Sequence, residues 1–188
     1  NANKDTRPSA KLSYARVSVQ KACFVLDAIR GKDVESALAI VMYNPRYVST
    51  LLEKIFFISF KHKGKQRIQS IAGLRTIAIT ASYGKTSIKN YLYHILKNKY
   101  KTYKTPRSVN TIAGIVLDVN RDIPLDTQIY IAEAGARVKG DIEEIAMFLE
   151  PQICVIGSVG PQHIEYFKTL DNIIHTKMEL LKSPKMKM

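Results

Sequence analysis

Residues 76–90, TIAITASYGKTSIKN, contain residue types that could bind a polyphosphate. The apolar, β-branched run Thr76–Thr80 predicts a short buried parallel strand, and a helix is expected from about Lys85. At such a helix start, backbone N–H groups and the positive helix end face an anion. Lys85 would add a positive charge, and the Thr86 hydroxyl could ligate Mg²⁺. The stretch therefore predicts a site for nucleotide phosphates.

The loop departs from the strict P-loop pattern, because Ile79 stands where that pattern has a glycine five residues before Gly84. Two interpretations stay open: a shorter phosphate loop, and an ordinary strand–helix turn with a surface Lys-Thr pair. On the first interpretation the phosphates are bound by six consecutive residues: Ser82, Tyr83, Gly84, Lys85, Thr86 and Ser87.

Glu133, His163 and Lys177 are further candidates for chemistry. We expect them at the carboxyl ends of successive strands, where open α/β sheets place their sites. A carboxylate, an imidazole and the Thr86 hydroxyl at one edge would suit Mg²⁺ held near phosphates. Taken singly, Glu133 is as well explained as a helix cap or surface acid, and His163 as a cap histidine. Their joint placement beside a phosphate loop favours a metal site.

Strand and helix patterns alternate after residue 74, which predicts an α/β fold: a partial parallel sheet with a P-loop and flanking helices. The expected strands are 76–80, 102–105, 128–132 and 153–157. The expected helices are 86–99, 111–119, 142–149 and 171–182.

A small three-helix segment is expected before this region, with helices at 18–30, 33–43 and 46–57. A basic run follows, and it would either contact nucleic acid or form a solvated linker. The chain thus divides into three parts: a helical segment, 1–57; a basic linker, 58–73; and an α/β domain, 74–188.

The net charge of the 188-residue chain is +13, and it is unevenly distributed. Residues 1–67 carry 13 Lys/Arg and 5 Asp/Glu, whereas residues 68–188 carry 16 and 11. The excess in the first part indicates a surface that faces a polyanion.

Cys23 and Cys154 lie in apolar runs without metal-binding spacing, and we expect both to be buried, reduced thiols. Reduced thiols favour a cytoplasmic location. No apolar run reaches membrane-spanning length, and the polar N-terminus is unlike a signal peptide. We therefore expect a cytoplasmic protein without membrane contact.

The run Arg16–Ile55 begins RVSVQKACFVLDAIRGKDVESAL. It resembles the helical half of the bacterial large-subunit ribosomal protein numbered twenty-two, through its Arg-Val-Ser start and the pattern Ile-Arg-Gly-Lys-x-Val-x-x-Ala-Leu. The resemblance implies a structural protein that binds rRNA; the same charges would also fit a solvated helix surface. The residues implied to contact RNA phosphates are Arg16, Lys21, Arg30, Lys32 and Arg46.

Five motifs in residues 74–183 resemble the central ATP-binding domain of the Mur ligases. The type is the one that joins D-alanyl-D-alanine to UDP-N-acetylmuramoyl-tripeptide in peptidoglycan precursor synthesis. The motifs are ITASYGKTSIKN, TPRSVNTIAGI, AEAGARVKGDIEEIAMFLEP, VIGSVGPQHIEYFKTLDNI and TKMELL. The resemblance implies ATP and Mg²⁺ as cofactors, and a UDP-muramoyl peptide and D-Ala-D-Ala as substrates that are joined through an acyl phosphate.

The positions in these motifs imply roles for individual residues. Lys85, His163 and Lys177 would be catalytic, and Asn110 would bind substrate. The implied metal ligands are Thr86, Glu133, His163 and Lys177, the last as a carbamylated lysine. Three positions depart from the family: Ala81 replaces a glycine that permits close backbone approach, and Thr111 and Ser158 stand where relatives often have Asn.

The two resemblances together imply parts of two genes joined in one chain. We find no counterpart of the family's other domains, so we expect the isolated chain not to ligate. We also expect Lys177 to lie hydrated and charged at an open sheet edge, which would oppose its carbamylation because that reaction needs a neutral amine.

Overall fold

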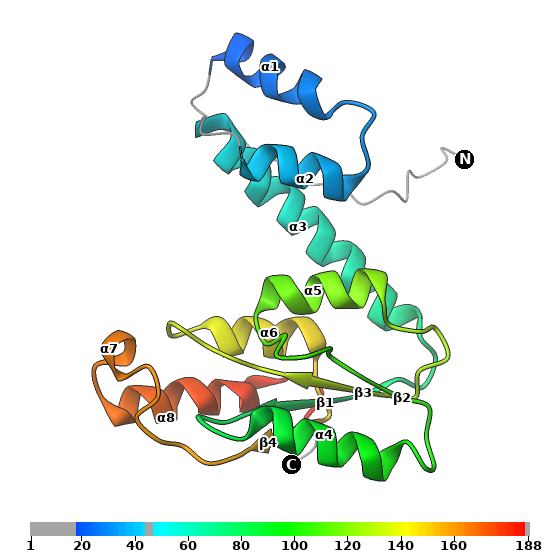
Figure 1. Cartoon of the computed structure of the whole chain (residues 1–188), viewed down its shortest axis with the longest axis vertical. Coiled ribbons are helices and arrows are strands. Elements are labelled where there is room, and N and C mark those ends of the chain that lie inside the picture. The colour runs from blue at the N-terminus through cyan, green and yellow to red at the C-terminus, as the bar shows by residue number, and fades with distance from the viewer. Residues whose placement is uncertain (1–17, 44–46, 187–188) are drawn as a thin grey trace. The chain divides into compact units, whose positions relative to one another are not determined.

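The computed structural model describes residues 18–43 and 47–186, which fall into two compact units within 1–63 and 64–188. Figure 1 shows helices in the first unit and a sheet flanked by helices in the second. Within these described residues, no helix is both long and apolar enough to cross a membrane.

The first unit is built from α1 (Val19–Ile29), α2 (Val34–Met42) and the start of α3 (Tyr47–Ser70). Apolar side chains from these helices form one core: Val25, Ile29, Ala37 and Val41, with Ala22, Ile40, Leu52 and Phe56 packed against them. Cys23 lies outside this core and is exposed, so the prediction of a buried thiol there was wrong.

Helix α3 continues to Ser70, well beyond the end expected at Phe57. The segment expected to be a linker contains no proline after Phe57, and its last turns pack within the second unit. A Cβ on Gly64 would lie 2.9 Å from the Asn120 side chain, so only glycine fits at this contact without displacement. Lys65 binds Glu150 at 2.5 Å.

The second unit contains the predicted parallel sheet, in the order β2-β3-β1-β4. Its strands are β1 (Arg75–Thr80), β2 (Thr102–Lys104), β3 (Ile129–Glu133) and β4 (Ile153–Ile156). Ile79 is in register with Glu133, and Thr80 with Ile156, so the neighbouring strands β3, β1 and β4 end within one residue of one another. The prediction of an α/β fold is confirmed.

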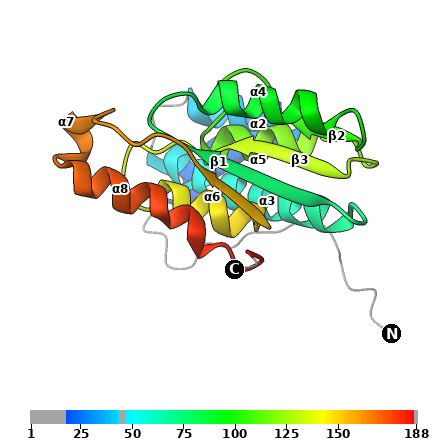
Figure 2. The same ribbon diagram turned by 90° about the horizontal axis from the view of Figure 1, so that it is seen from below.

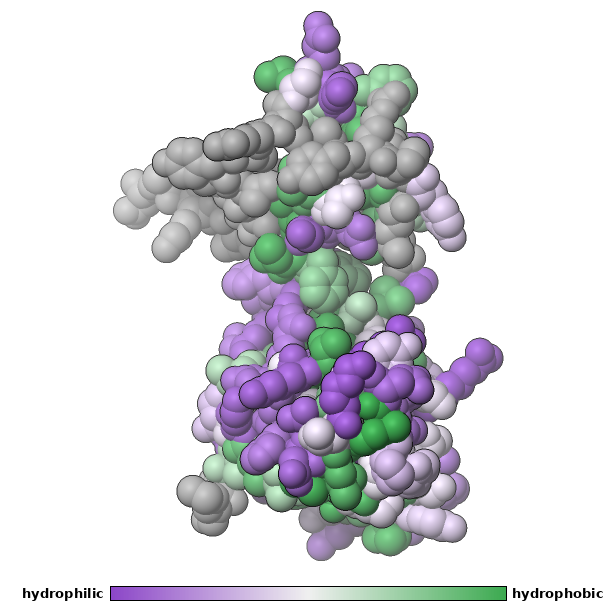
Figure 3. Space-filling view, turned by 90° about the vertical axis from the view of Figure 1, so that its left-hand side faces the viewer, coloured by the Kyte–Doolittle hydropathy of each residue, from purple (hydrophilic) through white to green (hydrophobic). Residues whose placement is uncertain are grey.

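Helices cover both faces of the sheet (Figure 2). On one face, α4 (Lys85–Leu96) packs its apolar side chains on the isoleucines of β1 and β3. The other face carries α5 (Ile112–Arg121), α6 (Asp141–Leu149), α8 (Leu170–Met178) and the 3₁₀ helix Glu179–Lys182. Hydrophilic and hydrophobic side chains are mixed on the side of this unit that Figure 3 presents.

Two buried carboxylates, those of Asp118 and Glu179, form hydrogen bonds among the elements on this second face of the sheet. The Asp118 carboxylate of α5 accepts hydrogen bonds from the Tyr103 and Tyr130 hydroxyls, both at 2.7 Å. Buried Glu179 accepts from the Gly140 and Glu143 N–H groups at the start of α6, at 2.9 and 3.2 Å. The latter contact joins the C-terminal helices to the loop after β3, and this loop lines the site.

Candidate functional site

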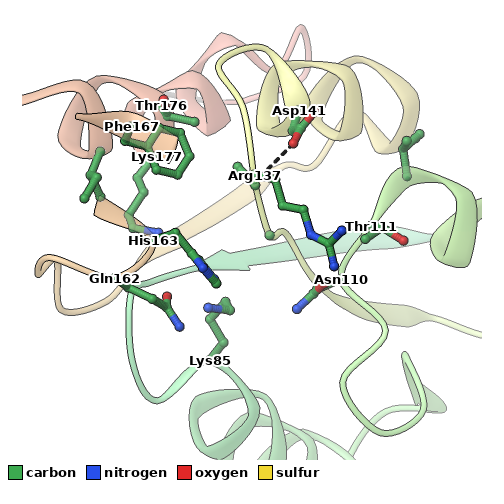
Figure 4. Close-up of a pocket in the computed structure, with 14 residues that line it drawn as sticks. Lys85, Asn110, Thr111, Arg137, Asp141, Gln162, His163, Phe167, Thr176 and Lys177 are labelled. Atoms are coloured by element: carbon green, nitrogen blue, oxygen red, sulfur yellow. Dashed lines mark hydrogen bonds between the residues drawn. The ribbon is translucent and has the colours of Figure 1, made fainter. Parts of the chain in front are cut away.

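A cavity of about 450 Å³ lies at the carboxyl edge of the sheet. Its walls come from the start of α4, from the loops after β2, β3 and β4, from the start of α5 and from α8. Figure 4 shows Lys85, His163 and Lys177 on one side, with Asn110 and Arg137 across from them. The polar residues of its walls are Lys85, Asn110, Thr111, Arg137, Asp141, Gln162, His163, Thr176 and Lys177.

The loop after β1 forms the tight turn that the sequence predicted. Gly84 precedes α4 with φ +80°, a left-handed conformation that glycine adopts without strain. The Lys85 Nζ folds back and donates to the carbonyl oxygens of Ala81 at 2.7 Å and Ser82 at 3.4 Å. Burial lowers the Lys85 pKa, and the Glu133 carboxylate partly offsets this. The ammonium thus lies over the loop, beside the cavity.

Ser82 connects the loop after β1 to the loop after β4. Its buried Oγ donates to the Gly160 carbonyl and accepts from the Gly160 N–H, both at 2.9 Å. Its own N–H donates to the Ser158 carbonyl at 2.8 Å. A Cβ on Gly160 would lie 3.0 Å from the Tyr83 ring. Ser82 and Tyr83 therefore set the distance between the two loops.

Thr86 and Ser87 lie in the first turn of α4, where Thr86 is half-buried and Ser87 exposed. Among the residues that the structure describes, the cavity wall includes Lys85 but neither of these two. Their predicted contacts with phosphate and Mg²⁺ stay predictions.

Glu133 ends β3 as expected, but its carboxylate is 1% exposed and pairs with an equally buried lysine. The Lys89 Nζ lies 2.7 Å from Glu133 Oε1, and this oxygen receives no well-aligned hydrogen bond. The same ammonium donates to the carbonyl of Thr105 at 2.8 Å and to that of Arg107. Sequence reasoning missed Lys89, although a lysine beside Ile88 on the sheet-facing side of α4 was a signal.

His163 and Lys177 both line the cavity. His163 is exposed at φ +58°, an uncommon conformation for a residue other than glycine. Lys177 lies inside α8 and not at a strand end, so its expected placement was wrong. It is also 8% exposed, which contradicts the expected hydrated state. Burial and, to a smaller extent, the charge of Lys85 lower the Lys177 pKa to about 8.

Asn110 reaches the cavity from the loop after β2. Its carbonyl accepts from the Gly135 N–H at 2.8 Å. A Cβ on Gly135 would lie 2.9 Å from the Asn110 Cγ, so glycine permits this close contact. Thr111 caps α5 by accepting from the Gly114 N–H at 3.3 Å. The loop that carries Asn110 is therefore held against the end of β3.

Arg137 and Asp141 are wall residues that the sequence analysis did not single out. The Asp141 carboxylate accepts from the Arg137 and Val138 N–H groups at 2.8 and 3.0 Å, and Figure 4 marks the first contact. Three cationic side chains also line the cavity, namely Lys85, Arg137 and Lys177. Such a wall favours an anionic ligand.

A metal ion would find few ready-made ligands. In the described part of the chain, no group of three or more His, Cys, Asp or Glu side chains is placed to hold one. Mg²⁺ bound here would take most of its oxygen ligands from phosphates and water, as it commonly does.

The residues expected to contact RNA lie in the other unit. Lys21, Arg30 and Lys32 are exposed, and Arg30 pairs with Asp27 at 3.2 Å. Two further residues fall outside the described ranges, namely Arg16 and Arg46.

Two family models match the chain. The Mur ligase middle domain matches residues 79–187, and ribosomal protein L22p/L17e matches residues 10–101, so the matches overlap at 79–101. The expected similarity to both families is thus confirmed.

Relatives of each kind share only part of their length with this chain. It is 84% identical over 55 residues to the large ribosomal subunit protein uL22 of Lachnoclostridium phytofermentans, covering 29% of this chain and 43% of that protein. It is 35% identical over 107 residues to the UDP-N-acetylmuramoyl-tripeptide–D-alanyl-D-alanine ligase of Borreliella burgdorferi, covering 57% of this chain and 23% of that protein.

Solved structures agree with the second match. The MurF ligase from Thermotoga maritima in complex with ADP has a TM-score of 0.61 at 33% identity, over 68% of this chain and 30% of that one. MurF from Acinetobacter baumannii has a TM-score of 0.65 at 26% identity, and the match covers 68% of this chain and 28% of that one. The chain therefore spans less than a third of these structures.

Proposed function

We propose that this chain, which belongs to the Mur ligase family through the middle domain at residues 79–187, provides the nucleotide site of an ATP-dependent ligase. The reaction would join D-Ala-D-Ala to a UDP-muramoyl tripeptide in the cytoplasm. The main support is the cavity where Lys85, Arg137 and Lys177 meet at the carboxyl edge of the sheet. A related structure with ADP, and the names of the similar ligases, support the choice of ligand and substrates.

The proposed reaction has two steps. A carboxylate oxygen of the peptide attacks the γ-phosphorus of ATP, and the bond to the ADP oxygen breaks to leave an acyl phosphate. The amine of D-Ala-D-Ala then attacks the acyl carbon, loses a proton and displaces phosphate. Negative charge moves over phosphate oxygens in both steps, so preorganised cations lower the barrier. Lys85 would exchange its contacts with Ala81 and Ser82 for the nucleotide phosphates.

The residues present fit a magnesium ion in one respect. The buried Glu133 carboxylate has about four lone-pair sites, and the Lys89 ammonium, 2.7 Å from Oε1, does not use them all, so the carboxylate could still offer oxygen to a cation. Glu133, Thr86 and His163 would hold the ion, with Lys177 joining them as a carbamate. When bound, Mg²⁺ would neutralise charge on the phosphates.

Isothermal calorimetry with ADP and Mg²⁺ tests the nucleotide site. We expect weak binding, with a Kd near 1 mM, or about −4 kcal/mol. Lys85→Ala should weaken it by about 1.5–3 kcal/mol, the strength of a hydrogen bond to a charged group. The matched control is Lys99→Ala, because Lys99 follows the opposite end of α4. Equal heats from wild type and Lys85→Ala would contradict the assignment.

A second candidate function belongs to the N-terminal segment, and the 84% identity to uL22 favours it. We propose that residues 1–57 bind RNA through exposed cations that include Lys21, Arg30 and Lys32. With roughly 4 phosphates engaged, log K should fall with log salt at a slope of about −3 to −4. A slope near zero would remove this proposal.

A further inference from the structure

We infer that Lys89 is a positioning residue of the nucleotide site: one buried ammonium fixes both the Glu133 carboxylate and the turn that leads to Asn110. The inference rests on the proposed function for its purpose, but its geometry is independent of that function. The sequence motif includes Lys89 without giving it a role, and the cavity wall excludes it.

Three oxygens surround the Lys89 ammonium. Glu133 Oε1 pairs with it at 2.7 Å, and the carbonyls of Thr105, at 2.8 Å, and Arg107 accept hydrogen bonds from it. Only 1% of the side chain is exposed. A buried charge is costly unless it is paired and hydrogen-bonded, and here it is both.

General stability does not explain a lysine at this position. The neighbouring α4 residues Ile88 and Leu92 pack on the apolar cluster of β1 and β3, so an apolar side chain would suit the same helix face. Replacing a buried ion pair by apolar residues is often neutral or stabilising. What an apolar residue would lose is the tie between Glu133 and the 105–107 turn.

That tie acts on a strained turn. Arg107 has φ +46°, a backbone conformation that is unfavourable in free energy for any residue other than glycine. The Lys89 ammonium donates a hydrogen bond to the Arg107 carbonyl. Three residues later, the Asn110 carbonyl binds the N–H of Gly135, two residues beyond Glu133. The loop 105–110 is therefore fastened to β3 and the residues after it by Lys89 and by two backbone hydrogen bonds, one at Asn110 and one from the Thr105 N–H to the Ile131 carbonyl at 2.9 Å.

A carboxylate fixed in this way is presented to a cation in one orientation. Residues that hold a metal-binding group commonly change metal affinity about 10–100-fold when they are removed. Lys89 is also positive, so a purely electrostatic role would have the opposite effect, since its removal would strengthen cation binding. The sign of the change therefore separates positioning from repulsion.

The first test is Lys89→Met, which keeps the length of the side chain and removes the charge. Amide hydrogen exchange of 105–110, read by mass spectrometry, should become at least about ten-fold faster, because the turn loses hydrogen bonds to a charged group. Amides of α6 should not change. The control is Lys104→Met, because the Lys104 ammonium donates to the Asn90 side chain. Unchanged exchange in 105–110 would overturn the inference.

The second test measures Mn²⁺ binding in the presence of ADP by electron paramagnetic resonance. Lys89→Met should weaken it about 10–100-fold. Tighter binding would overturn positioning in favour of repulsion. Should wild type bind no Mn²⁺–ADP, the proposed nucleotide site fails, and the exchange experiment still decides the role of Lys89.

A second variant covers the case in which Lys89→Met does not fold. Glu133→Gln leaves an oxygen for Lys89 to bind, so exchange in 105–110 should stay at the wild-type rate while Mn²⁺ affinity is lost. Faster exchange in this variant would show that the charge of Glu133, and not Lys89, holds the turn, and would overturn the inference.

Discussion

Replacing Lys177 by methionine should make the protein more stable at neutral pH, although it removes a cavity residue. Burial lowers the pKa of this lysine from 10.5 to about 8. At about 1.4 kcal/mol for each pKa unit, the charged form destabilises the folded state by about 3 kcal/mol below pH 8. Methionine fills a similar volume without a charge. We therefore expect Lys177→Met to raise the free energy of unfolding by up to about 3 kcal/mol at pH 7.

The pH dependence has a definite sign. Between pH 8 and 10.5 the unfolded chain holds a proton on Lys177 that the folded chain has lost, so wild-type stability rises through this window. The variant lacks this contribution. Its advantage should therefore shrink as pH rises from 8 towards 10.5. Other lysines titrate in both proteins and cancel in the difference.

Urea denaturation of wild type and Lys177→Met, at constant ionic strength and several pH values, measures this difference. Lys99→Met serves as the control, because Lys99 is an exposed lysine. A constant difference for Lys177→Met, or a loss of stability at pH 7, would refute the reasoning.

The same pKa bears on carbamylation. At pH 7.4 about a fifth of Lys177 would be neutral, against about one part in a thousand for an ordinary lysine. The objection that a hydrated, charged amine cannot react with CO₂ therefore no longer holds, and carbamylation stays a proposal for this site.

Three further substitutions test the framework around the cavity by urea denaturation. Gly84→Ala should cost about 1–2 kcal/mol, because φ is +80° while nothing lies within 4 Å of the new Cβ; a loss much larger than this would mean a steric clash. Asp118→Ala should cost about 2 kcal/mol or more, since the hydroxyls of Tyr103 and Tyr130 lose their acceptor, and an unchanged midpoint would contradict that. Ser82→Ala should cost about 1 kcal/mol, because it leaves a loop N–H without its acceptor, and full stability would show that water replaces it.

The sheet could be predicted because its strands carry a local signal. The β-branched run that ends at Thr80 and the apolar run that ends at Glu133 are buried on both faces, so they read as continuous hydrophobic segments. Small residues mark the turn before Lys85, and glycine there has the positive φ that the turn requires. These features are encoded within a few residues of one another.

The environment of the candidate site could not be predicted in the same way. Lys177 is buried because α8 packs against α6 and α7, which the helix's own sequence does not reveal. Lys89 pairs with Glu133 across a sequence separation of 44 residues, so no spacing rule pointed to it. Helix α3 extends past Phe57 because its last turns find partners in the second unit. Each of these is a tertiary effect.

The location of the positive charge yields a last prediction, which separates two sources of RNA binding. Residues 54–117 carry 13 Lys/Arg and no Asp or Glu. The net charge of this stretch is therefore +13, the same as that of the whole chain. Residues 1–53 carry 8 Lys/Arg and 5 Asp/Glu, so the ribosomal-type segment has only a small excess. If the helices of that segment carry binding, a Lys21/Arg30/Lys32→Ala variant should lower the magnitude of the salt slope by about 2, at roughly 0.7 for each phosphate lost from a single strand.

If charge density alone carries binding, a different pair of residues should matter. Lys61→Gln with Lys63→Gln should then lower the magnitude of the slope by about 1.4, while the three N-terminal substitutions leave it unchanged. Measuring both variants with the same single-stranded RNA at several salt concentrations decides between them. The first outcome supports a function that follows from similarity to uL22. The second would mean that a basic, acid-free stretch attracts any polyanion, and that the 84% identity describes ancestry and not activity.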